Sequence, residues 1–180
     1  MNFYEKTIES NKIFSGNIID VYLDKIILPN GNKASREVVS HPGGVCIAAI
    51  NKNNQIYFVR QYRYPKHEVI LELPAGKLEK NLSILENAKK ELKEEVGVIG
   101  KDFTYLGKAY ASPGISNEDL HMYFCKVEKL VKPTPDDGEF LEPLLIDLKE
   151  ALDMVMDNKI HDAKTQLTTL KLCMFLKLGL

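Results

Sequence analysis

Three glutamates, Glu91, Glu94 and Glu95, lie close together in a segment whose sequence is typical of a helix. Residues four positions apart on an α-helix project from the same face, so Glu91 and Glu95 are one turn apart with Glu94 beside them. Stacked like charges repel one another, and a set of oxygen ligands suits a hard cation such as Mg²⁺ or Mn²⁺. The spacing therefore indicates a divalent metal site and phosphate chemistry. The alternative is a solvated helix face, which most runs of lysine and glutamate form.

Signals at both ends set the limits of this helix at about residues 84–96. Ser83 and Glu86 have the spacing of a capping box at the helix start, and Gly97 supplies a left-handed stop. Apolar residues recur at helical spacing between these limits: Leu85, Ala88, Leu92 and Val96. This stripe should face the core, so the three glutamates border the interior of the fold.

The rest of the chain mixes strand and helix patterns without an internal repeat. Asn30 and Gly31 favour a tight hairpin turn between strands expected at residues 18–28 and 33–40. Further strands are expected at residues 44–51, 55–60, 104–111 and 120–128, and helices at residues 148–158 and 162–178. The last helix shows an apolar line of Leu167, Leu170, Met174 and Leu178. This order predicts an α/β protein whose helices cover a mixed sheet.

Residues 76–98 resemble the signature of the Nudix hydrolases, which spaces two glycines around a set of glutamates. The matching positions are Gly76, Glu91, Leu92, Glu94, Glu95, Gly97 and Val98. Leu82 stands where the signature has a glutamate, and Lys90 stands where it has an arginine. Lysine keeps the charge but lacks the planar fork that holds a carboxylate with two bonds. We expect activity to survive both changes, because the three helix glutamates remain.

Other segments resemble the ADP-ribose pyrophosphatase branch of this family: residues 36–45, 58–63, 71–76 and 112–118. The resemblance implies Mg²⁺-dependent hydrolysis, with Mn²⁺ as an alternative ion, of ADP-ribose or a related nucleoside diphosphate sugar to AMP and ribose 5-phosphate. A module that binds ADP-ribose with little or no turnover is the alternative raised by Leu82 and Lys90.

The same resemblance implies the Nudix fold, an α/β/α sandwich around a mixed sheet, with a small N-terminal region of β-strands. Residues 1–40 look like the strand domain that dimeric ADP-ribose pyrophosphatases pack across their partner. Residues 41–180 would then form the catalytic domain. We therefore expect a homodimer.

Hydrolysis of a phosphoric anhydride needs neutralised phosphate oxygens, an aligned water and a group that takes the proton of that water. In the family, a main-chain carbonyl at the position of Ala75 is a metal ligand beside the helix carboxylates. The expected metal ligands are Ala75, Glu91, Glu95 and Glu94, the last binding or positioning a second ion.

The general base is expected outside the helix, because a carboxylate engaged by cations accepts a proton poorly. Glu139 is the first choice, because residues 133–139 match a loop in which the family carries a mobile catalytic glutamate. Glu118 is the second choice, and Asp137 is a third. The alternative for each is an acidic loop residue that solvates a turn.

The expected substrate-binding residues are Arg36, Arg60, Arg63, Glu72 and Pro113. A guanidinium at a strand end could clamp a diphosphate, although a lone arginine on a strand is more often a surface charge. Glu72 could bind hydroxyl or amino groups of the ligand, or cap its strand. Pro113 lies fifteen residues beyond Val98, where the family carries a proline that marks ADP-ribose as substrate.

Composition favours a small-molecule enzyme of one domain. The chain has 180 residues, of which 44% are hydrophobic, so it can bury one good core. A net charge of −1 gives no broad basic surface for nucleic acid or an anionic membrane. The three cysteines are far apart, which indicates reduced thiols and neither a disulfide framework nor a zinc site. The polar start lacks a signal-peptide core, so we expect a cytoplasmic protein without a membrane or nucleic-acid partner.

Overall fold

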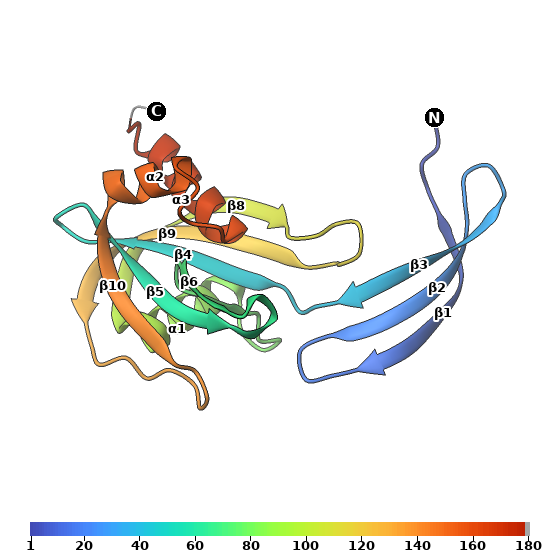
Figure 1. Cartoon of the computed structure of the whole chain (residues 1–180), viewed down its shortest axis with the longest axis horizontal. Helices are drawn as coiled ribbons and strands as arrows, with labels where there is room; N and C mark the ends of the chain where they lie inside the picture. The colour runs from blue at the N-terminus through green and yellow to red at the C-terminus, as the bar shows by residue number, and fades with distance from the viewer. Residues whose placement is uncertain (179–180) are drawn as a thin grey trace. The chain divides into compact units, whose positions relative to one another are not determined.

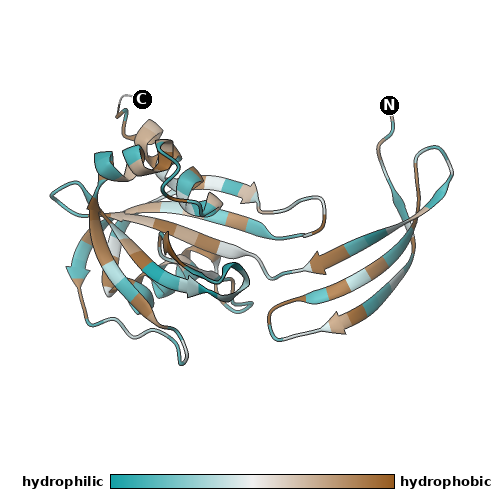
Figure 2. Ribbon diagram, in the orientation of Figure 1, coloured by the Kyte–Doolittle hydropathy of each residue, from teal (hydrophilic) through white to brown (hydrophobic). Residues whose placement is uncertain are grey.

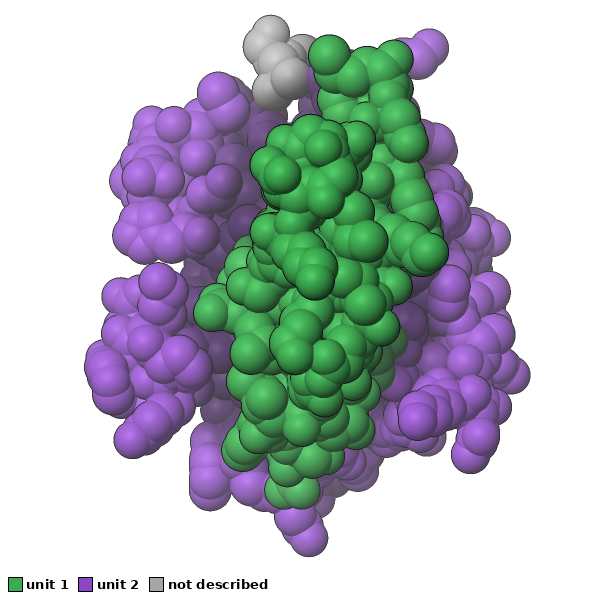
Figure 3. Space-filling view, turned by 90° about the vertical axis from the view of Figure 1, so that its right-hand side faces the viewer, with its two compact units in different colours: residues 1–43, 110–119 green, residues 44–109, 120–180 purple. Residues whose placement is uncertain are grey.

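The computed structural model describes residues 1–178, which divide into two compact units. Unit 1 consists of residues 1–43 and 110–119, and unit 2 contains residues 44–109 and the chain from residue 120 onward. Figure 3 colours the two units green and purple. No helix among the described residues has both the length and the apolar character needed to cross a membrane.

Unit 1 is built on a three-stranded antiparallel sheet in the order β1 (Lys6–Ser15), β2 (Asp20–Ile27) and β3 (Lys33–Ser40). The predicted hairpin joins β2 to β3, and Gly31 adopts the left-handed conformation there with a φ of 86°. Strand β1 was not predicted. All ten of its residues are exposed, because no element of the unit covers it and its side chains do not alternate between a core and solvent.

Unit 2 contains a mixed sheet, as predicted (Figure 1). The main path runs through five strands: β10 (Leu141–Asp147), β5 (Gln55–Arg63), β4 (Gly44–Ile50), β9 (Asp119–Leu130) and β8 (Val98–Tyr110). Strand β6 (Glu68–Glu72) pairs with β5, after a 3₁₀ turn η1 (Tyr64–Lys66), and the short strand β7 (Ala75–Lys77) pairs with β4. Strands β4 and β9 are parallel, whereas β5 and β7 run antiparallel to β4.

Helices cover both faces of this sheet, which confirms the expected α/β/α sandwich (Figure 1). Helix α1 (Ile84–Val96) lies on one face, and α2 (Leu148–Met156) and α3 (Ala163–Phe175) lie on the other. Every residue of β4 is buried, and its side chains alternate between the two cores. Strand β4 is therefore a continuous hydrophobic stretch, whereas other strands of this sheet mix hydrophobic and hydrophilic residues (Figure 2).

The face of α3 that packs on the core differs from the predicted one. The buried residues are Thr165, Thr168, Thr169, Leu172 and Cys173. Met174 is 62% exposed, and Leu178 lies beyond the helix and is 41% exposed. Of the predicted apolar line, Leu170 packs against the core, whereas Met174 and Leu178 do not belong to the buried face. Threonines take the buried positions, and the hydroxyls of Thr168 and Thr169 have no hydrogen-bond partner within residues 1–178. The Thr165 hydroxyl accepts a hydrogen bond from the Leu73 amide at 2.9 Å.

Candidate functional site

Helix α1 begins and ends as its sequence predicts. The Ser83 hydroxyl accepts a hydrogen bond from the Glu86 amide, and the Glu86 carboxylate accepts one from the Ser83 amide at 2.7 Å. Gly97 ends the helix with a φ of 64°. Ala88, Leu92 and Val96 are buried as the core-facing stripe, with Leu85 half-buried. This orientation sets Glu91 and Glu95 at the edge of the core.

The backbone of β7 lies against the two carboxylates. Glu95 is 4% exposed, and its Oε2 accepts a hydrogen bond from the Ala75 amide at 3.1 Å. Gly76 leaves the space that the Glu91 carboxyl group occupies, because a Cβ at this position would overlap that group. The structure thus brings together Glu91, Glu95 and Ala75, three of the four predicted metal-binding residues.

Burial and mutual repulsion change the titration of both carboxylates. Burial raises the pKa of Glu95 to about 8, and the charges of Glu91 and Glu139 add to this effect. Burial also raises the pKa of Glu91 to about 7, although Lys90 partly opposes it. The energetic cause is that two crowded, poorly solvated carboxylates resist ionisation when no cation compensates them.

The donor set fits a hard divalent cation that retains water ligands. Among residues 1–178, no group of three or more His, Cys, Asp or Glu side chains is placed to hold a metal ion alone. Glu91 and Glu95 would supply two carboxylates, and the carbonyl of Ala75, whose amide bonds Glu95, is the predicted third oxygen donor. Mg²⁺ is commonly bound by one or two carboxylates and keeps several waters, so this number of protein ligands is sufficient.

Glu94 is held by a lysine. Lys90 Nζ lies 2.5 Å from Glu94 Oε2 and 3.1 Å from Glu79 Oε1. The hydrogen bond to Glu94 is the main reason that the pKa of Lys90 rises above its usual range. Glu94, the fourth predicted metal-binding residue, therefore lies beside the buried pair with its charge compensated by Lys90.

The loop that contains Glu139 is attached to the end of α1. The Val131 amide donates to the Gly97 carbonyl at 2.8 Å, and the Thr134 amide donates to the Glu94 carbonyl at 2.9 Å. Glu139 is exposed, yet its charge contributes to the raised pKa of both Glu91 and Glu95. The first-choice general base thus lies within electrostatic reach of the buried carboxylates.

A buried ion network borders the same carboxylates. Glu72 is 1% exposed and receives two hydrogen bonds from Arg63, at 2.6 and 2.7 Å. Lys164 also bonds Glu72, and its Nζ lies 2.9 Å from Asp162 Oδ1. Burial alone would raise the pKa of Glu72, but the Arg63 and Lys164 contacts outweigh it and hold this pKa below its usual value. Arg63 also lies close enough to Glu95 to oppose the rise in its pKa.

Lys164 was missed in the sequence because a single lysine in the first turn of a helix reads as a surface charge. The nearby N-cap Asp162 is the signal that could have revealed Lys164, because Asp162 binds both the Thr165 amide and Lys164.

A hollow of about 400 Å³ adjoins the network of Arg63, Glu72, Asp162 and Lys164. It is lined by Arg63, Pro65, Lys66, Glu68, Ile70, His161, Asp162 and Ala163.

A second hollow in unit 2, of about 450 Å³, contains two more predicted residues, Arg60 and Glu139. The rest of its lining is Tyr62, Val69, Pro135, Phe140, Leu141 and Glu142. Arg60 lies 3.2 Å from Glu142 in an exposed ion pair, and Tyr62 is 52% exposed. Aromatic and guanidinium groups therefore share an accessible surface with the first-choice base.

The remaining predicted residues, Arg36, Pro113 and Glu118, belong to unit 1. Arg36 is paired with Glu5 at 2.5 Å, and Pro113 is exposed. Glu118 Oε1 lies 3.6 Å from Nδ1 of His41. That nitrogen accepts a hydrogen bond from the Gly43 amide at 3.1 Å, so the ring proton of neutral His41 is assigned to Nε2.

Comparison with known proteins adds family relationships to this geometry. The NUDIX domain family matches residues 40–167, and the nucleoside diphosphate sugar hydrolase N-terminal domain family matches residues 5–39. An ADP-ribose pyrophosphatase of Bacillus subtilis (strain 168) is 39% identical over 163 residues, covering 89% of this chain and 88% of the relative. A methanol dehydrogenase activator of Bacillus methanolicus is 39% identical over 165 residues, which cover 91% of this chain and 89% of that relative.

A solved structure of an ADP compounds hydrolase is similar to the whole fold. Its TM-score is 0.86 at 19% sequence identity, and the match covers 98% of this chain and 97% of that one. At this identity the likeness supports the arrangement of the elements.

The raised pKa values of Glu91 and Glu95 predict opposite effects of pH with and without metal. From about pH 4.5 to 8, the folded protein retains protons that the unfolded chain releases, so metal-free stability should fall as pH rises. If the pair binds Mg²⁺, the ion requires the ionised carboxylates, so its stabilising effect should grow over the same range. Thermal unfolding at about pH 6 and pH 9, with EDTA or excess Mg²⁺, measures both trends. A Mg²⁺-induced shift in Tm that is equal at the two pH values would contradict the prediction.

Proposed function

Because the chain belongs to the NUDIX family of hydrolases, we propose that it hydrolyses the diphosphate bond of ADP-ribose, or of a related nucleoside diphosphate sugar, to AMP and ribose 5-phosphate. The observation that carries the proposal is the buried pair Glu91 and Glu95 facing the backbone of β7. The names of the relatives support the substrate class, because one is an ADP-ribose pyrophosphatase.

The family generally uses a divalent metal ion, and for this chain we propose Mg²⁺, with Mn²⁺ as an alternative. Glu91, Glu95 and the Ala75 carbonyl would hold it, with Glu94 binding or positioning a second ion. Bound there, the metal would neutralise charge on the diphosphate and lower the pKa of a bound water. This assignment accounts for two carboxylates whose buried positions disfavour their ionised forms.

Arg63 is proposed to orient the diphosphate, supported by its place between Glu72 and Glu95. Glu72 binds the Nε and one terminal nitrogen of Arg63, and the other terminal nitrogen makes no hydrogen bond within residues 1–178. Glu72 acts through Arg63 in this proposal, because its own oxygens already accept bonds from Arg63 and Lys164. Arg60, Arg36 and Pro113 remain proposed substrate contacts.

Glu139 is proposed to take the proton of the attacking water, and Glu118 is the second choice. Glu139→Gln should lower kcat by about 10²- to 10⁴-fold, the range typical for loss of a general base. The exposed position of Glu139 predicts an unchanged fold. Steady-state kinetics of Glu139→Gln and Glu118→Gln decide between the two. A larger loss of kcat in Glu118→Gln would reverse their order.

The direct test is release of AMP when purified protein is incubated with ADP-ribose and Mg²⁺, with Glu95→Gln as the inactive control. ADP-glucose, GDP-mannose and NADH complete the substrate panel. A protein that binds ADP-ribose but releases no more AMP than Glu95→Gln would be a sensor module. That outcome would overturn the hydrolase proposal, and preferential turnover of another panel member would change the substrate class.

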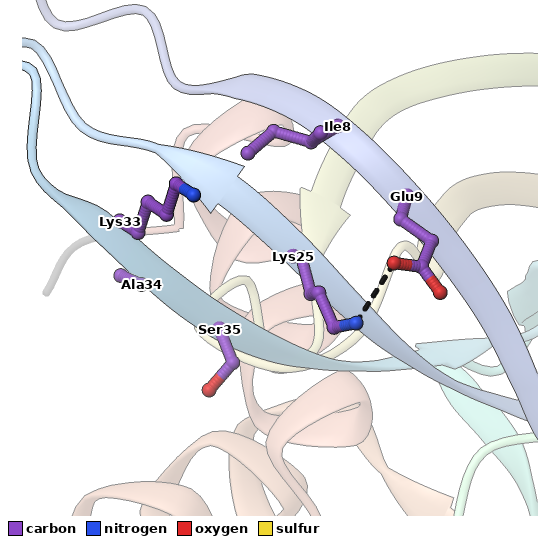
Figure 4. A pocket seen from close by; sticks show the side chains of 6 residues that line it. All are labelled: Ile8, Glu9, Lys25, Lys33, Ala34 and Ser35. Atoms are coloured by element: carbon purple, nitrogen blue, oxygen red, sulfur yellow. Dashed lines mark hydrogen bonds and ion pairs between the residues drawn. The ribbon is translucent and has the colours of Figure 1, made fainter.

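Residues 1–40 are proposed as a dimerisation element and residues 41–180 as the catalytic domain. The sheet of unit 1 exposes Ile8, Ile13 and Phe14, and three strands alone bury little apolar surface. A hollow of about 550 Å³ on this sheet is lined by Ile8, Glu9, Lys25, Lys33, Ala34 and Ser35 (Figure 4). Light scattering tests the proposal, because a monomeric wild type, or an Ile8→Asp/Ile13→Asp variant that stays dimeric, would refute it.

A cytoplasmic location is proposed, supported by three free cysteines, all buried. The near-neutral net charge supports a small-molecule substrate over a nucleic-acid or membrane partner. Fractionation of cells that express the chain with an internal epitope tests the location, and recovery in the membrane or secreted fraction would contradict it.

A further inference from the structure

We infer that Glu79 is a positioning residue for the acidic helix, because it gives Lys90 a second anchor and thereby fixes Glu94. The inference rests on the proposed metal-dependent function and concerns a residue that is not one of the matching positions of the family signature. Glu79 is not one of the expected ligands, and its carboxylate contacts the lysine and no other described side chain.

Lys90 needs two anchors because of its chemistry. A guanidinium can grip one carboxylate with two parallel bonds, whereas an ammonium is a point charge on a flexible stem. A single ion pair would leave Lys90 free to turn, and Glu94 would turn with it. Contacts to Glu79 at 3.1 Å and to Glu94 at 2.5 Å hold the ammonium between two carboxylates. The lysine side chain is only 29% exposed, so solvent competes weakly for it.

The turn that carries Glu79 is itself fixed to α1. The fully buried Asn87 accepts a hydrogen bond from the Glu79 amide at 2.8 Å. The Asn87 amide group donates to the carbonyls of Leu82 and Ser83, at 3.3 and 3.0 Å. The Leu82 amide closes the turn by donating to the Glu79 carbonyl at 3.2 Å. Glu79 is thus held by its backbone next to the helix, and its carboxylate reaches Lys90.

The position of Glu79 compensates for both departures from the family signature, Leu82 and Lys90. Leu82 removes an acid near the helix, and Glu79 supplies one three residues earlier on the same turn. Lys90 lacks the fork of an arginine, and the second acid compensates by limiting its freedom.

Glu79→Gln should weaken Mn²⁺ binding by about 2- to 5-fold, the range expected for loss of one partly exposed ion pair. Electron paramagnetic resonance of free Mn²⁺ measures this without substrate, so the result does not depend on turnover. Glu128→Gln is the matched control, because Glu128 is an exposed acid outside the helix. Glu79 is 53% exposed, so circular dichroism should show an unchanged fold.

Two rescue experiments separate this role from a general structural one. Adding Leu82→Glu to Glu79→Gln should restore Mn²⁺ affinity, because the acid returns to the turn. In a Lys90→Arg background, Glu79→Gln should have a smaller effect, because arginine can hold Glu94 alone. Wild-type affinity in Glu79→Gln, an equal loss in a Lys90→Met background, or no Mn²⁺ binding by the unaltered protein would each overturn the inference. A protein that binds Mn²⁺ in this pattern but does not cleave ADP-ribose would refute only the proposed function.

Discussion

Gly76→Ala should strongly reduce hydrolysis while leaving the protein folded. The new Cβ would occupy the space of the Glu91 carboxyl group. That group is the end of a flexible side chain, so it can turn away at little cost to the fold. This rotation of the Glu91 side chain removes one of two carboxylates from the proposed metal site. Loss of even an outer partner of a metal ligand costs about 10- to 100-fold in activity, so we expect a fall in kcat/KM of about 100-fold or more.

Kinetics and thermal unfolding of Gly76→Ala, Glu91→Gln and the double variant test this mechanism. If the methyl group acts through Glu91, the double variant should be no less active than Glu91→Gln. Additive losses would show that Gly76→Ala disturbs something other than Glu91. A large fall in Tm for Gly76→Ala would contradict the expectation that the fold adapts.

Glu72→Ala should produce the largest loss of stability, about 3 kcal/mol or more. Glu72 is 1% exposed and compensates both Arg63 and Lys164. Removing one member of a buried ion cluster leaves uncompensated buried charge, which costs about 3–5 kcal/mol. Arg63 is 40% exposed and can turn toward solvent, which places the expectation at the lower end of that range. Urea unfolding measures the loss.

Glu142→Ala is a suitable control for this loss. Glu142 pairs with Arg60, which lies on β5 as Arg63 does, but both side chains of this pair are exposed. This substitution should lower the free energy of unfolding by less than about 1 kcal/mol.

The low pKa of Glu72 also determines how its contribution to stability changes with pH. Its contribution is present above the pKa of the unfolded chain and is lost as pH falls through the lower folded value. The difference in the free energy of unfolding between wild type and Glu72→Gln should therefore become smaller in acid. A difference that grows in acid would contradict the stabilising role of ionised Glu72.

Features with local causes could be predicted from the sequence. The ends of α1 follow from Ser83, Glu86 and Gly97, whose side chains or backbone act within one helical turn. The Asn30-Gly31 hairpin follows from backbone conformations that few residues adopt. The order of the elements predicted a mixed sheet covered by helices, and the resemblance to the family implied the α/β/α sandwich. Strand β4 agrees with both, because it is buried on both faces between two helical layers.

Features that depend on distant partners could not be predicted. The buried face of α3 contains threonines, and the one at its start is accepted there because the Leu73 amide, far away in sequence, satisfies its hydroxyl. Lys164 reads as an exposed lysine until Glu72 is placed beside it. Likewise, spacing alone gave no sign that Glu79 meets Lys90. In each case the deciding contact joins segments whose separation along the chain carries no periodic signal.

The loop that carries Glu139 is attached to the helix that holds Glu91 and Glu95, through the bonds of Val131 and Thr134 to the end of α1. A side chain on Gly97 would break this attachment, because its Cβ would collide with Val131 and crowd Pro133. In the proposed mechanism, the general base and the metal-binding pair would therefore depend on one helix for their positions. The proposed substrate contacts Arg60 and Arg63 lie on strand β5, so substitutions there should change substrate preference while leaving the groups on α1 in place.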